Sequence, residues 1–153
     1  MKKILFTVLL VLSSPSSLWA SDQQAEGLVS VQSPFSVEET ANRMEQVLNE
    51  KGMTVFNRVN HSEAAKKVGL ALRDTVLIMF GNPKAGSPLM QCQQTVAIDF
   101  PQKALIWKDE NADVWVSYNQ PSYLKSRHLM QGCEQNIVKI TKALEAIVKQ
   151  SVE

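Results

Sequence analysis

The sequence predicts a single α+β domain, a two-layer sandwich in which a mostly antiparallel sheet is covered by helices, the longest of them C-terminal. The expected elements run strand, helix, strand, short helix, strand, hairpin, short helix and long helix, with the later strands close together in sequence, which favours this class. The composition, 153 residues with 44% hydrophobic and 20% charged, is that of an ordinary globular domain. No repeat or linker divides residues 28–153, so we expect one domain there.

The first half of this domain begins with a strand candidate at 28–31, followed by a helix over 37–51. Ser36 is a good N-cap for that helix, and Glu39 three places later completes a capping box. Apolar residues then recur at helical spacing as far as Gly52, which suits the residue after a helix. Alternation predicts a strand over 53–59, and a short helix over 62–68, ending at Gly69, comes next.

The residues from Thr75 to Phe80 form a continuous apolar, β-prone run. Such a run predicts a strand that is covered on both faces or lies at the middle of the sheet. The segment from Gly81 to Pro88 combines two glycines and two prolines with an asparagine, which predicts a dense turn. Residues 89–91 are then expected to start a short helix.

The second half contains a hairpin and two helices. Strands over 103–108 and 114–118 are joined by a polar loop. Pro121 suits the first position of a short helix that continues over 122–127. The last segment, 134–150, carries an apolar stripe at spacings of three and four, which predicts a long amphipathic helix.

The N-terminus has the pattern of an export signal. Two lysines precede an apolar run at 4–12, and a serine-rich segment leads to Ala20, a small residue suited to cleavage before Ser21. The run is far shorter than the roughly 20 residues of a membrane span. We therefore expect a signal peptide at 1–20, a flexible tether at 21–27 and a periplasmic or secreted protein with no stable membrane anchor after cleavage. An uncleaved anchor is the alternative.

Cys92 and Cys133 are the two cysteines of the chain. In an oxidising compartment they permit one intramolecular disulfide. The alternative is two separate buried thiols that act as small hydrophobic residues. Their separation excludes a Cys-x-x-Cys redox motif.

The charges and motifs exclude several functions. With 16 basic and 15 acidic residues the chain has no basic excess, so we expect no nucleic-acid partner. No cofactor motif is present, and we expect no cofactor. His61 and His128 could join Asp99, Cys92 or Asp109 around a metal, but no pair has the close spacing of a metal site. Metal handling is therefore a secondary hypothesis.

The segment 81–91 is the strongest candidate for a ligand site. Its turn chemistry predicts exposed backbone amides that, with Lys84, could hold a carboxylate or a phosphate. It resembles a phosphate-binding loop in glycine spacing, but the lysine that should precede Ser87 is absent, which excludes nucleotide hydrolysis. A turn that merely redirects the chain is the alternative.

Aromatic residues gather around the hairpin. Trp107 and Trp115 flank its loop and could pair across the strands, with Tyr118 and Tyr123 nearby in sequence. Core packing or an oligomer surface explains them, and a hydrophobic ligand pocket beside the sheet is the functional alternative.

Several of these segments together resemble the domain-of-unknown-function family number 302. The resemblance covers about residues 30–148 and is carried by 80–91, 103–107, 114–119 and Arg127-His128. It implies a strand–helix–four-strand–helix arrangement similar to the TATA-binding-protein fold, often assembled as a dimer. The family has no established activity, so the resemblance implies no catalytic residue. Gln120, where an acidic residue is usual, and Cys92 depart from its pattern.

We therefore expect an exported, non-enzymatic small-ligand-binding or protein-interaction module that forms a homodimer and takes a small-molecule or anionic ligand. The alternative is an enzyme of unassigned class with His128 as general acid or base near Lys84. The candidate ligand-binding residues are Gly81, Asn82, Lys84, Gly86, Met90, Gln91, Tyr118, Asn119 and His128.

Overall fold

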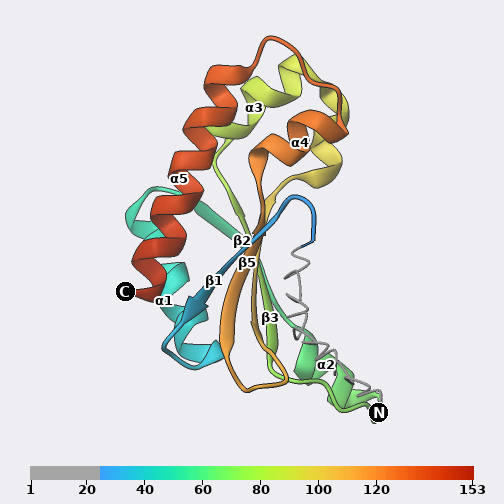
Figure 1. The fold of residues 1–153 in the computed structure, drawn as a ribbon, viewed down its shortest axis with the longest axis vertical. Helices are drawn as coiled ribbons and strands as arrows, with labels where there is room; N and C mark the ends of the chain where they lie inside the picture. The colour runs from blue at the N-terminus through green and yellow to red at the C-terminus, as the bar shows by residue number, and fades with distance from the viewer. Residues whose placement is uncertain (1–24) are drawn as a thin grey trace, which may run out of the picture.

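The computed structural model describes residues 25–153, so the expected signal peptide and the tether as far as residue 24 lie outside the described residues. The described chain is an α+β domain with an antiparallel five-stranded sheet of order β1-β5-β4-β3-β2. Helices α1 and α5 lie against one face of the sheet, whereas α3 and α4 lie beyond one end of it (Figure 1). The predicted fold class is confirmed. The elements are β1 (Leu28–Ser33), α1 (Val37–Glu50), β2 (Thr54–Asn60), α2 (His61–Lys67), β3 (Thr75–Gly81), α3 (Pro83–Cys92), η1 (Gln94–Asp99), β4 (Gln102–Lys108), β5 (Val114–Asn119), α4 (Pro121–Arg127) and α5 (Glu134–Val152).

Helix α1 begins at the predicted residue, Val37, and ends at Glu50, one residue before the predicted end. The Ser36 hydroxyl accepts a hydrogen bond from the Glu39 N–H, 3.2 Å away, which satisfies one of the free donors at the helix start. After the helix, Gly52 adopts a φ of 67°, a left-handed conformation that glycine reaches without steric cost. On the inner face of α1, Met44 and Leu48 are fully buried against the sheet.

The core lies between the sheet and the α1/α5 layer. Strand β3 contributes Val76, Ile78 and Phe80, and their neighbours on β4 and β5 share this face. Leu77 and Met79 alternate with them and are only half-buried on the opposite face. The strand is paired on both sides inside the sheet, which is the second of the two predicted alternatives. The first alternative, cover on both faces, does not apply, because helices α1 and α5 cover one face.

The opposite face of the sheet carries the paired tryptophans. Trp107 and Trp115 stand directly across from one another on β4 and β5. The Trp107 Nε1–H donates to the Ser117 hydroxyl at 2.8 Å, and the Trp115 Nε1–H donates to Asp109 Oδ2 at 2.8 Å. This second bond, above all, holds the pKa of Asp109 below its usual value, because it stabilises the carboxylate. Both indole rings are thereby fixed on the open face.

The segment predicted as a turn is largely helix. Only Gly81 and Asn82 precede α3, whose first residue is Pro83. Asn82 caps the helix, and proline is favoured at the first helical position because that N–H has no helical partner. Pro88 lies inside α3 and cannot donate to the Lys84 carbonyl four residues earlier. Leu89, fully buried, anchors this irregular helix to the core.

The end of the expected tether is ordered. The Leu28 N–H donates to the Ala25 carbonyl at 3.0 Å, which closes a turn, and the Gln120 N–H donates to the Gly27 carbonyl at 2.8 Å. Gly27 has a φ of 76° and packs its Cα directly against the ring of Tyr123. Two residues assigned to the tether, Ala25 and Gly27, are thus hydrogen-bonded to the start of β1 and the end of β5. Within residues 25–153 no helix combines the length and apolar character that crossing a bilayer requires.

Candidate functional site

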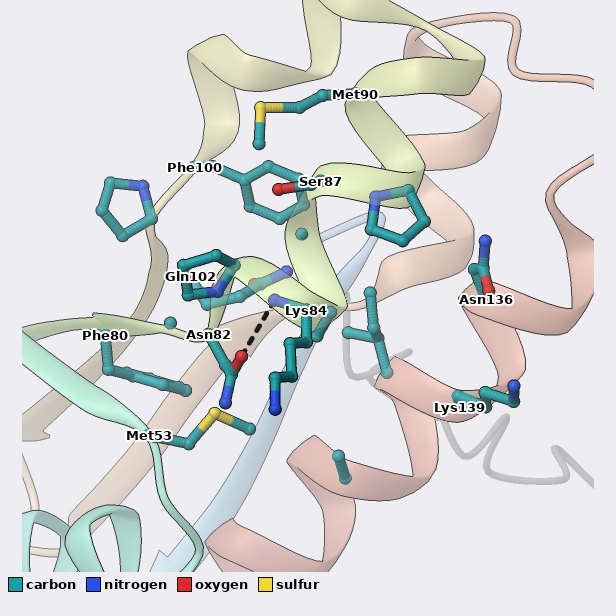
Figure 2. A pocket seen from close by; sticks show the side chains of 18 of the residues that line it. Met53, Phe80, Asn82, Lys84, Ser87, Met90, Phe100, Gln102, Asn136 and Lys139 are labelled. Atoms are coloured by element: carbon teal, nitrogen blue, oxygen red, sulfur yellow. Dashed lines mark hydrogen bonds between the residues drawn. The ribbon is translucent and has the colours of Figure 1, made fainter.

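A cleft of about 820 Å³ opens between α3 and α5, above the ends of β3 and β4 (Figure 2). This volume is in the range of pockets that hold small molecules. Its lining is mostly apolar and includes Met53, Phe80, Met90, Phe100, Ile140 and Leu144.

Asn82 fixes the position of α3 at the edge of this cleft. Its Oδ1 accepts from the Lys84 N–H at 2.9 Å, and its backbone carbonyl accepts from the N–H groups of Ala85 and Gly86 at 2.9 and 3.0 Å. Its Nδ2 donates to the Gly52 carbonyl at 3.0 Å, which ties α3 to the end of α1. The expectation of free backbone amides here is wrong, because the amides after Pro83 are used by the cap.

The charged residues that line the cleft are two lysines. Lys84 projects from α3, and Lys139 from α5 (Figure 2). Both side chains are exposed at the mouth. No aspartate or glutamate is among the described residues that line the cleft. Its potential is therefore positive, which favours an anionic ligand at the mouth.

Gln102, the first residue of β4, extends under α3. It is paired with Phe80 in the sheet and points to the same face as Ala104 and Ile106. The residue is 9% exposed, and its Nε2 has no hydrogen-bond partner among the described residues. Figure 2 shows this side chain directed into the space enclosed by Phe100, Asn82 and Lys84.

The two cysteines lie at the ends of the helices that form the cleft. Cys92 is the last residue of α3, and Cys133 is the residue that precedes α5. Their sulfur atoms are in contact, and their Cα atoms are 6.5 Å apart, a separation that a disulfide spans.

Five of the nine candidate ligand-binding residues line the cleft, namely Gly81, Asn82, Lys84, Gly86 and Met90. Gln91 is exposed on α3 outside the lining, and Asn119 pairs with Leu28 at the end of β5. Tyr118 and His128 also lie outside the cleft lining. The predicted grouping of Tyr118, Asn119 and His128 with the segment 81–91 is thus not the arrangement that the structure describes.

His128 follows α4 and is fixed by two side chains. Its Nε2 is 2.6 Å from Asp99 Oδ2, and its Nδ1 is 3.1 Å from the Thr95 hydroxyl. Arg127 adds a second cation 3.5 Å from Asp99 Oδ1. Both ring nitrogens of His128 are therefore engaged in joining α4 to η1, which gives no support to a role as general acid or base near Lys84.

Tyr118 lines a second, smaller cavity of about 470 Å³ between β1, β5 and α5. Burial raises the pKa of Tyr118, and the negative charge of Glu145 adds to this increase. The phenol therefore stays protonated at neutral pH. The two cavities are lined by different residues of α5.

The described residues contain no group of three or more His, Cys, Asp or Glu side chains that could hold a metal ion. His61 begins α2, with Asn60 as its cap, and His128 is at α4. The two histidines thus belong to separate elements.

The sequence analysis missed several residues of the cleft, of which Gln102 is the most informative. A signal was present, because Gln102 continues the alternation of Ala104 and Ile106 toward the core face, where a polar side chain is unexpected. Phe100 and Lys139 were missed because no local pattern indicates which loop or helix face meets α3.

Comparison with known proteins gives relatives of two kinds. The fluoride-specific ion channels FluC 1 of Brucella suis biovar 1 (strain 1330) and FluC 1 of Brucella abortus biovar 1 (strain 9-941) are each 46% identical to the chain over 102 residues. This segment is 67% of the chain but 40% and 38% of those two proteins, so the chain spans about two fifths of the length of the relatives it matches.

A solved structure supports the fold. The crystal structure of an uncharacterized conserved protein DUF302 from Bacillus stearothermophilus matches with a TM-score of 0.76 at 20% identity, covering 83% of this chain and 99% of that one. The model of the family described as "Domain of unknown function DUF302" matches residues 29–147, and the chain is therefore a member of this family.

Proposed function

We propose that this protein is exported and binds a small amphipathic molecule in the cleft between α3 and α5. The observation that carries the proposal is the cleft itself, about 820 Å³ of mostly apolar lining in which the charged residues are Lys84 and Lys139. Burial of an apolar body supplies most of the affinity in such a site, and a few polar groups supply orientation.

The sign of the charge favours an anionic ligand. A carboxylate or similar group at the mouth is attracted by both ammonium groups, and these groups remain partly hydrated because they are exposed. Each exposed ion pair between a lysine ammonium group and the ligand's anionic group contributes little to the binding free energy, about 0.2–1 kcal/mol. The lysines therefore select the sign of the ligand more than they set its affinity.

Two observations favour binding over catalysis. The described residues that line the cleft include Ser87 and two lysines, but no histidine, aspartate or glutamate that would act as a general base to activate them. In addition, the matching segment is a minor part of proteins named fluoride-specific ion channels. A unit that occurs joined to a different protein supports a role as a binding or interaction module.

Substitution at Gly86 tests the site. A Cβ at this position would lie 3.9 Å from Met90 Cε and 4.0 Å from Phe100 Cε2, so it points into the cleft without a clash. We expect Gly86→Trp to abolish binding of 2-naphthoate, because the indole fills the space between those two side chains. Isothermal titration calorimetry measures the loss, with 2-naphthylmethylammonium as a cationic probe of the same shape that should bind wild type more weakly.

Gly86→Ala is the matched control. We expect it to keep the binding of 2-naphthoate and to raise the free energy of unfolding by about 0.5–1 kcal/mol, because alanine is the better residue inside a helix. If wild type binds neither probe, or if Gly86→Trp binds 2-naphthoate as well as wild type does, the cleft is not the ligand site.

We also propose that the chain loses residues 1–20 and assembles as a homodimer. The open face of the sheet supports the dimer. No long helix among residues 25–153 covers this face, and the side chains half-buried there are those of Leu77, Met79, Leu105, Trp107 and Trp115. Native mass spectrometry of protein released from the periplasm is expected to give a chain that starts at Ser21 and a mass of two chains. A spectrum of the full-length chain would contradict the proposed cleavage, and a mass of one chain would contradict the proposed dimer.

A further inference from the structure

Gln102 occupies a position at which the fold calls for an apolar residue. Its side chain lies on the core face of β4, the same face as the side chains of Ala104 and Ile106, which are both fully buried. A polar side chain at this position interrupts the alternation of apolar and polar residues along the strand. Such departures from the sequence pattern concentrate at functional sites.

The Gln102 amide is buried and incompletely paired. With 9% exposure it has lost most of its contact with bulk solvent, and Nε2 finds no acceptor among the described residues. Buried amide donors in folded proteins are almost always paired, because an unpaired one forfeits its hydration without compensation. The protein therefore maintains an unfavourable donor at the wall of the cleft between α3 and α5.

The geometry points to Gln102 as the residue that recognises a hydrogen-bond acceptor on the ligand, an inference that rests on the proposed function of the cleft. The surroundings are apolar, with Phe80 beside it in the sheet and Phe100 also in the wall. The matching ligand is an apolar ring or chain that carries a carbonyl oxygen into this space. A pure hydrocarbon leaves Nε2 unpaired and is bound less tightly.

The test compares two probes of nearly equal shape, 2-acetylnaphthalene and 2-isopropenylnaphthalene, of which only the first has an oxygen acceptor. We expect wild type to bind the ketone about tenfold more tightly, the difference that one hydrogen bond makes in a shielded site. In Gln102→Met, which has a similar length and no donor, we expect the two dissociation constants to become equal. Nuclear magnetic resonance should also show the Gln102 side-chain amide protons of wild type shifting with the ketone and not with the hydrocarbon.

The outcomes separate this inference from the proposed function. If wild type binds both probes equally and the Gln102 amide signals do not move, the cleft binds ligands but Gln102 does not recognise an acceptor. If wild type binds neither probe nor 2-naphthoate, the proposed function itself fails. Should Gln102→Met not fold, the amide shifts in wild type decide alone.

Discussion

Replacing Cys92 and Cys133 together by alanine is expected to lower the free energy of unfolding by about 4 kcal/mol. We propose that the two cysteines, 41 residues apart and in sulfur contact, form a disulfide in the exported protein. A link that closes a loop of this length removes roughly that much conformational freedom from the unfolded chain on the chain-entropy view. Urea denaturation of the wild type and the double variant measures the difference.

The same substitution should weaken binding, because the bridge joins the end of α3 to the start of α5 and these helices form two walls of the cleft. Reduction with dithiothreitol is the control. It should destabilise wild type by the same amount and leave the alanine double variant unchanged. Two reactive thiols in denatured, unreduced protein would show that the bridge is absent.

Gly27→Ala is expected to lower the free energy of unfolding by about 2–5 kcal/mol. The left-handed backbone conformation, with a φ of 76°, costs a residue with a Cβ about 1–2 kcal/mol. A Cβ would also lie 2.3 Å from Tyr123 Cγ, so the ring must move, and such overpacking typically costs another 1–3 kcal/mol. Thermal and urea denaturation of the folded variant measure the loss.

Gly69→Ala provides a matched control for this prediction. Gly69 has nearly the same conformation, with a φ of 78°, but a Cβ there would meet nothing within 4 Å. Its substitution should therefore carry the conformational cost of about 1–2 kcal/mol alone. Equal losses at the two glycines would mean that Tyr123 yields freely and that the turn before β1 is not held by its ring.

The elements that the sequence predicts well are those whose signals are local. Helix α1 has Ser36 as a cap and a regular apolar stripe, and α5 has its stripe at spacings of three and four, so both begin where they were expected. The segment of helix α3 was predicted to be a turn because Gly86 and Pro88 are residues that favour turns over helices. The pair Asn82-Pro83, a cap followed by proline at the first position, is the local signal that favours the helix instead.

The candidate site was predictable in part for the same reason. Within the segment 81–91, residues 81–88 and 90 line the cleft. Because they are neighbours in sequence, a local pattern was enough to predict them. Tyr118 and His128 were expected to converge with them in one concave region, yet one lines a separate cavity and the other joins α4 to η1. Which parts of α5 meet which strands depends on the packed sheet order, and no single segment encodes that order.

The tryptophan pair on the open face has a practical consequence. The chain has three tryptophans, and Trp19 lies in the segment expected to be removed, so Trp107 and Trp115 are the indoles of the exported form. Neither lines the cleft. Intrinsic fluorescence emission will therefore follow solvent exclusion from the uncovered side of the sheet, as the proposed dimer would bring about. The emission will change little when a ligand binds in the cleft between α3 and α5, so the fluorescence spectrum can report assembly independently of ligand binding.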